Sequence, residues 1–433
     1  MHPPVVIVGA GQAGLSMSYH LTQRNVDHIV LEREQIGHEW RERRWDSFCL
    51  VTPNWQCQLP GFPYTGDDPD GFMVRKDIVR YIEEYARSFA PPVIEDVAAT
   101  RLRRDRKGKY LLGTTRGELI ADQVVLATGP YQVPLIPRLA DRLPEGLTQL
   151  HSSQYRNPGQ LPAGEVLVIG TGQSGCQIAE DLHLAGRQVH LSVGSAPRVA
   201  RFYRGRDVVA WLDSVGYYRK AVDEFADVDT VRFRVNHYVT GRDGGRDIDL
   251  RAFAREGMRL YGRLAGVTHN TTLRFAPDLE RNLDHADAVS ESIKDSIDSY
   301  IEAHHIDAPP EPRYTPVWRP ERETTQADLN GITSVIWSTG FGRDDRWIEV
   351  PVFDGRGYPT HNRGVTSSPG LYFLGLPWQH TWGSGRFSGV AQDAADLTER
   401  VTAGPDRHFC WIAGTPTSTF PRDGEWVAPR TVA

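Results

Sequence analysis

Two glycine-rich turns, each placed directly after a run of apolar residues, are the part of this chain best suited to hold a ligand. The first turn contains Gly9, Gly11 and Gly14, and the second contains Gly170, Gly172 and Gly175. The spacing of the three glycines is the same in both turns. Glycine at these positions permits a tight turn, close approach of backbone N–H groups to a pyrophosphate and close packing of helix on strand. The positive end of the following helix then faces the negative charge. Each turn predicts one dinucleotide site, and a protein with two such sites is typically an electron-transfer enzyme.

The first turn is surrounded by the elements that a dinucleotide-binding unit needs. Residues 5–8 form a continuous apolar run, which is typical of a parallel strand buried on both faces. A predicted helix follows the turn, and residues 28–31 form a second strand that ends in Glu32, 18 residues after Gly14. A carboxylate at this position accepts the ribose hydroxyls of an adenosine. We therefore expect Glu32 to contact the dinucleotide.

The second turn lies in a similar sequence of elements. Residues 166–169 predict a buried strand, residues 176–184 a helix and residues 188–193 the next strand. Gln173 and Ser174, which lie between Gly172 and Gly175, are expected to contact the second dinucleotide together with the glycines.

Three further strands complete the expected sheets. Residues 123–129 and 333–341 are apolar runs that close in the same Thr-Gly pair, and residues 370–375 predict the last strand. A final helix is predicted over residues 388–401. We expect these strand ends to border a cofactor at Thr128, Gly129, Thr339, Gly340 and Gly375.

These elements define the expected fold class and its divisions. The pattern predicts an α/β protein with two Rossmann-like dinucleotide-binding domains in three layers and an insertion in the second domain. The expected divisions are residues 1–135 and 331–403 for the first domain, 136–162 for a linker, 163–330 for the second domain with its insertion at about 199–330, and 404–433 for a tail.

A loop rich in aromatic residues separates the first unit from its remaining strands. Residues 36–64 contain six large aromatic side chains, Trp40 among them, and three prolines. Such a loop is expected to fold against a flat ring. Residues 77–89 then predict an amphipathic helix, and residues 93–120 predict short antiparallel strands.

Composition excludes several classes of function. The 433 residues include 49 Lys and Arg against 55 Asp and Glu, a net charge of −6, and the scattered positive charges argue against a nucleic-acid surface. The four cysteines have no metal-ligand spacing, so we expect no metal site and reduced thiols in a cytoplasmic protein. No apolar stretch approaches the roughly 18 residues of a membrane-spanning helix. Trp411 and Trp426 in the tail are expected to cover the surface or a subunit contact, as in a homodimer.

With both glycine turns and both Thr-Gly strands assigned, the chain resembles the flavin-containing monooxygenases, a class that also contains Baeyer–Villiger and N-hydroxylating enzymes. The resemblance implies FAD at the first turn and NADPH at the second. More narrowly, residues 44–48 and 52–60 resemble a bacterial family of flavin-dependent oxidoreductases carried beside a nitrilase in gene clusters.

The linker fingerprint of the class is present in part. Its nearest match is Gly146, His151 and Tyr155, where the spacing from histidine to aromatic residue fits, the glycine is one residue too far away and a phenylalanine is missing. Tyr155 in place of a Trp-Pro or Trp-Asp pair argues against a Baeyer–Villiger enzyme. His151 has either a functional role or the role of a hinge histidine bonded to the backbone.

The resemblance also implies a catalytic residue. Asn54 aligns with an asparagine that many members have beside the flavin C4a–N5 edge, where a neutral amide can hydrogen-bond a peroxide without protonating it. The alternative is that Asn54, which follows Pro53, makes a turn.

Residues beyond the second unit indicate which nicotinamide dinucleotide binds. No acidic residue follows the strand at 188–193, whereas Ser195 and then Arg198 do. A guanidinium can pair with a 2′-phosphate, although arginines are also common on solvated loops. The sequence favours NADPH over NADH.

The implied function is an FAD- and NADPH-dependent monooxygenase that acts through a C4a-(hydro)peroxyflavin and inserts one oxygen atom from O2 into a small nitrogen- or sulfur-containing substrate. The alternatives are a flavin-dependent amine oxidase or dehydrogenase that does not use NADPH, and a non-enzymatic FAD-binding sensor. A flavin disulfide reductase needs two cysteines a few residues apart, whereas Cys49 and Cys57 are eight residues apart.

Overall fold

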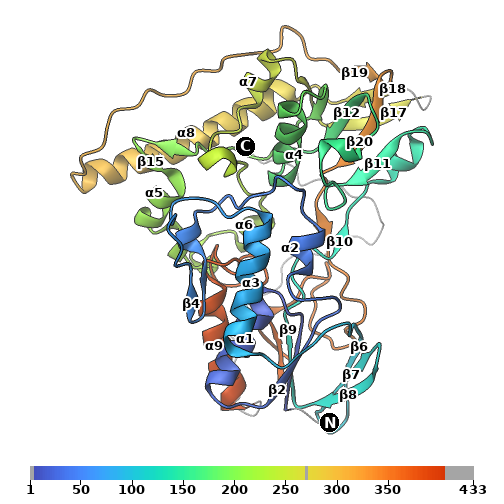
Figure 1. Ribbon diagram of the computed structural model, residues 1–433, viewed down its shortest axis with the longest axis vertical. Coiled ribbons are helices and arrows are strands. Elements are labelled where there is room, and N and C mark those ends of the chain that lie inside the picture. The colour runs from blue at the N-terminus through green and yellow to red at the C-terminus, as the bar shows by residue number, and fades with distance from the viewer. Residues whose placement is uncertain (1–3, 269–271, 405–433) are drawn as a thin grey trace.

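Two sheets organise the computed structural model, which describes residues 4–268 and 272–404 (Figure 1). The first sheet lies in the lower half of Figure 1 and has seven strands in the order β22 (His361–Asn362), β23 (Val365–Thr366), β24 (Leu371–Phe373), β9 (Gln123–Leu126), β1 (Val5–Val8), β2 (His28–Leu31) and β5 (Val93–Ile94). The second sheet lies in the upper half and has five strands in the order β11 (Thr148–His151), β20 (Ile332–Trp337), β12 (Glu165–Ile169), β13 (Val189–Ser192) and β16 (Arg259–Tyr261).

The first sheet is covered on both faces, which explains its uninterrupted apolar strands. Every residue of β1, β2 and β9 is buried, and β1 pairs in parallel with both neighbours. One face packs against α1 (Gln12–Gln23), α3 (Arg75–Phe89) and α9 (Val390–Ala403). The other face packs against the antiparallel strands β6 (Ala99–Arg104), β7 (Tyr110–Thr114) and β8 (Gly117–Ala121).

The second sheet has the same construction. Strand β12 pairs in parallel with β13 and β20, and helix α4 (Gln173–Leu184) packs on one face through Ile178 and Leu182. A three-stranded antiparallel sheet packs on the other face and consists of β17 (Leu264–Thr268), β18 (Thr272–Phe275) and β19 (Gln326–Asp328). Parallel strands with a helical layer on one face are typical of a Rossmann-type flavoprotein fold, so the predicted α/β class is confirmed.

The segment at residues 199–330, which we expected to be an insertion, is partly integrated into the second sheet. It contributes β16 to the second sheet, and its helices are α5 (Val208–Val215), α6 (Val228–Phe233), α7 (Leu250–Arg255) and α8 (Leu279–Ala303). Helix α8 runs across the upper left of Figure 1. Trp211 of α5 and Ile297 of α8 belong to one buried cluster, which fixes the two helices against each other.

Three strands lie in sheets other than those the sequence suggested. Strand β20, which we expected beside the first turn, pairs with β12 and β11 of the second sheet. Strand β11 comes from the expected linker, and β5 joins the first sheet in parallel rather than an antiparallel unit. An apolar run ending in Thr-Gly fits either sheet, so only the tertiary pairing decides between them.

The two sheets are linked where the chain crosses between them. Strand β10 (Val133–Pro134) follows the first sheet and pairs antiparallel with β21 (Phe341–Gly342), which follows β20 of the second sheet. The remaining short elements are α2 (His38–Glu42), β3 (Gln58–Leu59), β4 (Phe62–Pro63), β14 (Phe202–Tyr203) and β15 (Arg206–Asp207).

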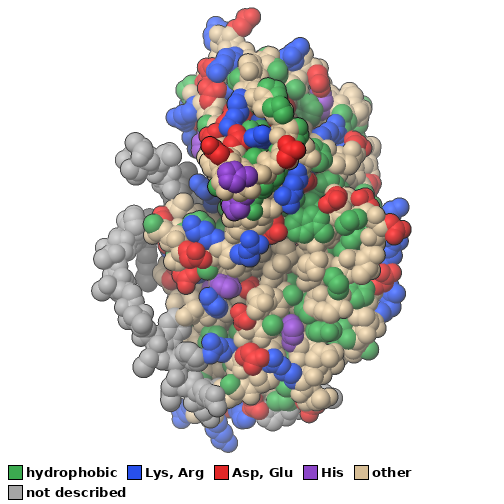
Figure 2. All heavy atoms as spheres, turned by 90° about the vertical axis from the view of Figure 1, so that its left-hand side faces the viewer, with side chains coloured by type: hydrophobic (Ala, Val, Ile, Leu, Met, Phe, Trp, Pro, Cys, Tyr) green, Lys and Arg blue, Asp and Glu red, His purple; other side chains and the backbone are tan. Residues whose placement is uncertain are grey.

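Acidic and basic side chains are interspersed over the face drawn in Figure 2, without a large patch of one sign. This agrees with the scattered charge of the sequence. None of the helices in the two described ranges is long and apolar enough to cross a membrane. Trp411 and Trp426 lie outside the described residues.

Candidate functional site

The first glycine turn connects β1 to α1, and each of its glycines has a separate reason to lack a side chain. Gly9 has φ +105°, and a Cβ there would lie 2.5 Å from the Ala127 carbonyl oxygen. A Cβ on Gly14 would overlap the Gly9 carbonyl oxygen, so this glycine lets the helix approach the strand. A Cβ on Gly11 would meet no described atom within 4 Å. The backbone at Gly11 is therefore open to close approach by a ligand.

The second turn repeats this geometry between β12 and α4. Gly170 has φ +100°, and a Cβ there would lie 2.6 Å from the Ser338 carbonyl oxygen. A Cβ on Gly175 would overlap the Gly170 carbonyl oxygen, whereas one on Gly172 would reach only Val235, at 3.8 Å. Neither α1 nor α4 has a side-chain cap, so the first N–H groups of both helices are open to an anion.

Glu32 lies beside the first turn, as its spacing predicted. It follows β2, and its Oε2 accepts a hydrogen bond from the Ala10 N–H at 2.7 Å. Its Oε1 accepts from the Glu34 N–H at 3.1 Å. The half-buried carboxylate is thus held at the edge of the turn.

The two Thr-Gly pairs lie at the crossovers between the sheets. Gln132 Nε2 donates to Thr128 Oγ1 and to the Gly129 carbonyl, both at 3.0 Å. On the other crossover, Thr339 Oγ1 donates to the Leu135 carbonyl. The hydroxyls of both threonines therefore form hydrogen bonds within the crossover segments. A cofactor contact for the two Thr-Gly pairs stays a prediction.

His151 is fully buried at the same crossover. Its Nε2 lies 3.0 Å from the carbonyl oxygen of Gly340, and its Nδ1 accepts from the Ser153 N–H at 3.2 Å. Burial lowers the pKa of the imidazole. These contacts match the hinge interpretation, because both ring nitrogens are already bonded to the protein.

Residues 375–387, which precede α9, pack against the first turn. Gln12 Nε2 donates to the Gly385 carbonyl at 2.9 Å, and Gly375, with φ +87°, lies so close that a Cβ would be 2.9 Å from that of Ala13. Phe387 stacks on Trp40 with ring centroids 5.6 Å apart and planes 23° apart. Gly375 therefore lies beside the first turn, and Trp40 packs on the segment that contacts this turn.

Asn54 is 4% exposed, and its amide bonds to the backbone of a neighbouring loop. Nδ2 donates to the Asp68 carbonyl at 2.9 Å, and Oδ1 accepts from the Met73 N–H at 2.7 Å. This arrangement fixes the loop at residues 68–73, so it favours the structural interpretation of Asn54. The catalytic role stays a prediction.

Around the second turn, Gln173 bonds to a segment far along the chain. Its side chain donates to the Val239 carbonyl and accepts from the Val239 N–H at 3.3 Å. Ser174 is half-buried at the start of α4, and Ser195 is exposed beyond β13. Gln173 thus fixes the segment that passes the turn, and a cofactor contact for Ser174 and Ser195 stays a prediction.

Arg198 lies in a buried ion-pair cluster. It is 3% exposed, and its Nε donates to Asp287 Oδ1 at 2.6 Å. Its Nη1 lies 3.7 Å from Asp247 Oδ2, and the guanidinium lies 4.1 Å from the centre of the Tyr314 ring. A cation already neutralised by Asp287 is poorly available to a 2′-phosphate, so the geometry argues against the role that the sequence suggested.

The described cysteines, Cys49, Cys57 and Cys176, are buried and form no disulfide. Burial raises the pKa of Cys49 to about 11 and that of Cys57 to about 12. A thiol exchanges with a disulfide only as its thiolate, so these two residues are unsuited to disulfide reduction. Cys410 lies outside the described residues.

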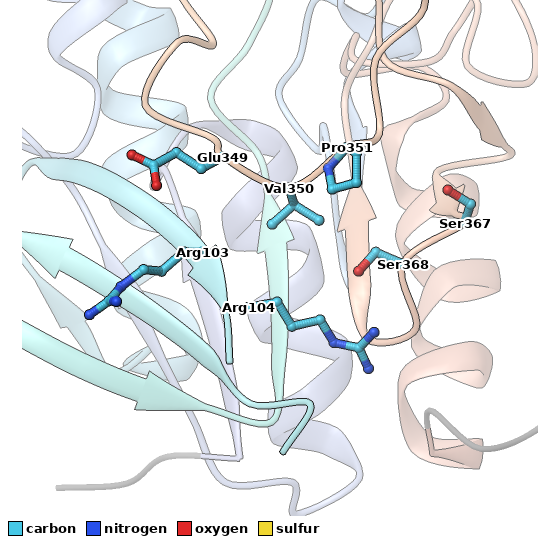
Figure 3. Close-up of a pocket in the computed structure, with 7 residues that line it drawn as sticks. All are labelled: Arg103, Arg104, Glu349, Val350, Pro351, Ser367 and Ser368. Carbon is cyan, nitrogen blue, oxygen red and sulfur yellow. The ribbon is translucent and has the colours of Figure 1, made fainter. Parts of the chain in front are cut away.

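A cleft of about 350 Å³ lies on the first sheet, away from the glycine turns (Figure 3). Ser368 precedes β24, so the cleft lies toward the amino ends of the parallel strands, whereas ligands bind at their carboxyl ends. Arg103 pairs with Glu118, and Ser368 bonds to the Tyr110 hydroxyl at 2.7 Å. We assign this cleft no chemistry.

Asp393, in the first turn of α9, is a buried acid that sequence reasoning missed. It is 5% exposed, its Oδ1 lies 3.8 Å from His380 Nδ1, and its Oδ2 has no partner among the described residues. Burial raises the pKa of Asp393 to about 7, while the Ser384 hydroxyl and Arg363 lower it and Asp396 raises it. No spacing in the sequence marks this acid, because its burial is created by tertiary packing.

We expect Asp393→Asn to remove a pH dependence of stability. The folded-state pKa of about 7 lies above the unfolded value near 4, so the folded protein binds this proton more tightly, and the resulting stability is lost as pH rises from about 4 to about 7. Relative to the wild type, the variant should gain up to about 4 kcal/mol in free energy of unfolding over this range. Urea unfolding at several pH values measures the gain.

Glu399→Gln is the control for that experiment, because Glu399 is an exposed carboxylate on the same helix. Its stability difference from the wild type should not vary with pH beyond about 0.5 kcal/mol. Parallel pH curves for the wild type and Asp393→Asn would contradict the elevated pKa.

The fold and the site together define the class of the protein: an oxidoreductase with two equivalent dinucleotide-binding turns, each following a parallel strand of its sheet. The family model of the pyridine nucleotide-disulphide oxidoreductases matches residues 6–241, and the chain belongs to this family. The CzcO-like oxidoreductase of Geobacillus kaustophilus is 33% identical over 92% of this chain and 97% of that protein.

Solved structures agree with this assignment. A flavin-containing monooxygenase from Stenotrophomonas maltophilia superposes with a TM-score of 0.63 at 20% identity, covering 93% of this chain and 99% of that chain. An ornithine N-hydroxylase from Kutzneria sp. 744, in complex with reduced FAD, NADP+ and L-ornithine, superposes with a TM-score of 0.60 at 16% identity and the same coverage. The fold that the resemblance to flavin-containing monooxygenases implies is therefore confirmed.

Proposed function

We propose that this chain is an FAD- and NADPH-dependent monooxygenase that transfers one oxygen atom from O2 to a small nitrogen- or sulfur-containing substrate. The pair of equivalent glycine turns carries the proposal, because two dinucleotide sites in one chain suit electron transfer between two dinucleotides. Bound flavin would supply the redox chemistry with O2, while the protein supplies binding, orientation and exclusion of water.

The residues at the first turn fit FAD. The open space at Gly11 and the uncapped start of α1 suit a pyrophosphate, which backbone N–H groups would bind. We propose that Glu32 turns from its bonds with the Ala10 and Glu34 N–H groups to accept the ribose hydroxyls. Gly375 packs beside Ala13 of α1, Trp40 packs on Phe387, and both are proposed to contact the cofactor.

We assign NADPH to the second turn. Gly172, Ser174 and the uncapped start of α4 suit its pyrophosphate, and the absence of an acidic residue directly after β13 favours a 2′-phosphate over a free ribose hydroxyl. The exposed Ser195 hydroxyl is proposed to donate to that end of the dinucleotide. Arg198 instead stabilises the fold through Asp287.

Anaerobic mixing of the FAD-loaded protein with NADPH tests the first half of this function. We expect the visible absorbance of oxidised flavin to disappear, and NADPH should act at much lower concentration than NADH. No loss of absorbance would contradict the proposal and favour an amine oxidase or a sensor.

The second half is tested with oxygen. Reaction under 18O2 in the presence of amines and sulfides should give a product that contains one labelled oxygen atom for each NADPH consumed. Stoichiometric hydrogen peroxide with every compound of the panel would favour an oxidase instead.

A further inference from the structure

A cleft of about 360 Å³ is formed by three segments that are distant in the sequence. Its walls come from residues 55–58, from residues 213–219 at the end of α5, and from residues 381–389 before α9. The aromatic loop, the segment after the second unit and the C-terminal segment therefore meet at one place.

Two residues that line this cleft each have a buried polar atom without a hydrogen-bond partner among the described residues. These atoms are Gln56 Oε1 and Ser388 Oγ, and Gln56 is only 3% exposed. Gln58 in the same wall differs, because its Nε2 donates to the Trp55 carbonyl at 2.6 Å. A buried amide oxygen without a donor is unfavourable, and the described residues supply no donor to Gln56 Oε1.

The remaining walls define the kind of ligand. Asp213 and Arg219 form an ion pair at 3.8 Å, so the charges of the lining largely cancel. Trp55 and Tyr218 present aromatic surfaces, and Tyr218 packs on Trp382 with ring centroids 4.6 Å apart. The cleft therefore suits an uncharged molecule with a flat apolar group and one hydrogen-bond donor.

The C-terminal wall also contacts the first glycine turn. Gly385 accepts the hydrogen bond from Gln12 at the start of α1, and Phe387 stacks on Trp40. Residues 383–389 thus connect the cleft directly to the proposed FAD site. A ligand in the cleft would therefore contact the segment that borders the proposed FAD site.

We propose that this cleft is the subsite for the oxygen-accepting substrate, and that it binds a small flat molecule through an uncharged N–H or O–H group that donates to Gln56 Oε1, with the Ser388 hydroxyl as a second contact. The inference rests on the proposed function, to which it adds the class of substrate. Flavin also carries an N–H group between two carbonyls, so the test must separate substrate from cofactor.

Calorimetric titration of the FAD-loaded protein at pH 8 with aniline, N,N-dimethylaniline and thioanisole tests the proposal. The three compounds are flat and uncharged at this pH, and only aniline has an N–H donor. The wild type should bind aniline about fivefold more tightly than the other two. Gln56→Leu should abolish this preference, and Gln392→Leu, which changes an exposed glutamine on α9, should retain it.

Equal affinities of the wild type for the three compounds, or an unchanged preference in Gln56→Leu, would overturn the subsite. The Gln56→Leu protein could also release FAD and still prefer aniline. This result would assign the amide oxygen to the cofactor and would overturn the proposed subsite. If Gln56→Leu does not fold, Ser388→Ala replaces it and should lower the aniline preference about threefold. Binding of aniline without NADPH-dependent oxygenation would contradict the proposed function and leave the subsite standing.

Discussion

Gly11→Ala is expected to weaken FAD binding about tenfold or more while leaving the fold of the protein unchanged. The backbone at Gly11 has φ −73°, which alanine adopts readily, and the added Cβ would meet no described atom within 4 Å. The methyl group would instead occupy the space proposed for the pyrophosphate. Flavin fluorescence measures the FAD affinity, and thermal unfolding of the cofactor-free protein measures the fold.

Gly14→Ala is the matched comparison in the same turn. Its Cβ would overlap the Gly9 carbonyl oxygen, so we expect a loss of about 3 kcal/mol or more in free energy of unfolding, even without FAD. Gly172→Ala should weaken NADP+ binding and leave FAD bound, because the same open position occurs in the second turn. Release of FAD by Gly172→Ala, or unchanged FAD affinity in Gly11→Ala, would contradict the assignment of the two turns.

Arg198→Ala is expected to destabilise the protein by about 3 kcal/mol without changing the preference for NADP+ over NAD+. Removal of the guanidinium leaves Asp287 with Arg251 Nε at 2.9 Å as its remaining cation, and the Tyr314 ring loses the charge packed on it. A buried carboxylate that loses a cationic partner is costly. Urea unfolding measures the stability, and calorimetry measures the affinities for NADP+ and NAD+.

Arg234→Ala is the control for this prediction, because Arg234 is exposed in the segment that passes the second turn. Its effect on stability should stay within about 0.5 kcal/mol. If Arg198→Ala instead keeps the wild-type stability and weakens NADP+ far more than NAD+, the interpretation from the sequence is correct and the ion-pair cluster is not structural.

The positions of the individual site residues show where sequence reasoning stops. Asn54 follows Pro53 within a short motif, and the motif cannot show that both polar ends of the amide bond to the backbone at residues 68–73. Gln132 was not singled out, although it bonds to both members of the first Thr-Gly pair. Glutamine is common on surfaces, so no local pattern distinguishes such a residue.

The sequence by itself determined the two glycine turns, the strands and helices beside them and the position of Glu32. These features depend on residues that are close together in the sequence. A buried strand requires a run of apolar residues, and a tight turn requires glycine where φ is positive or where a Cβ has no room. The amphipathic helix predicted at residues 77–89 was found as α3 for the same reason, with Ile78, Ile82 and Tyr85 buried on one face.

Only the tertiary structure decided which sheet contains β20, which acid neutralises Arg198 and that Gln56 and Ser388 line one cleft. Arg198 and Asp287 are 89 residues apart, and Gln56 and Ser388 come from opposite ends of the chain. Burial and ion pairing depend on the distances between such segments after folding, and spacing along the chain does not encode those distances. The glycine turns therefore revealed the class of protein, whereas the residues proposed to bind its substrate emerged only from the packing around them.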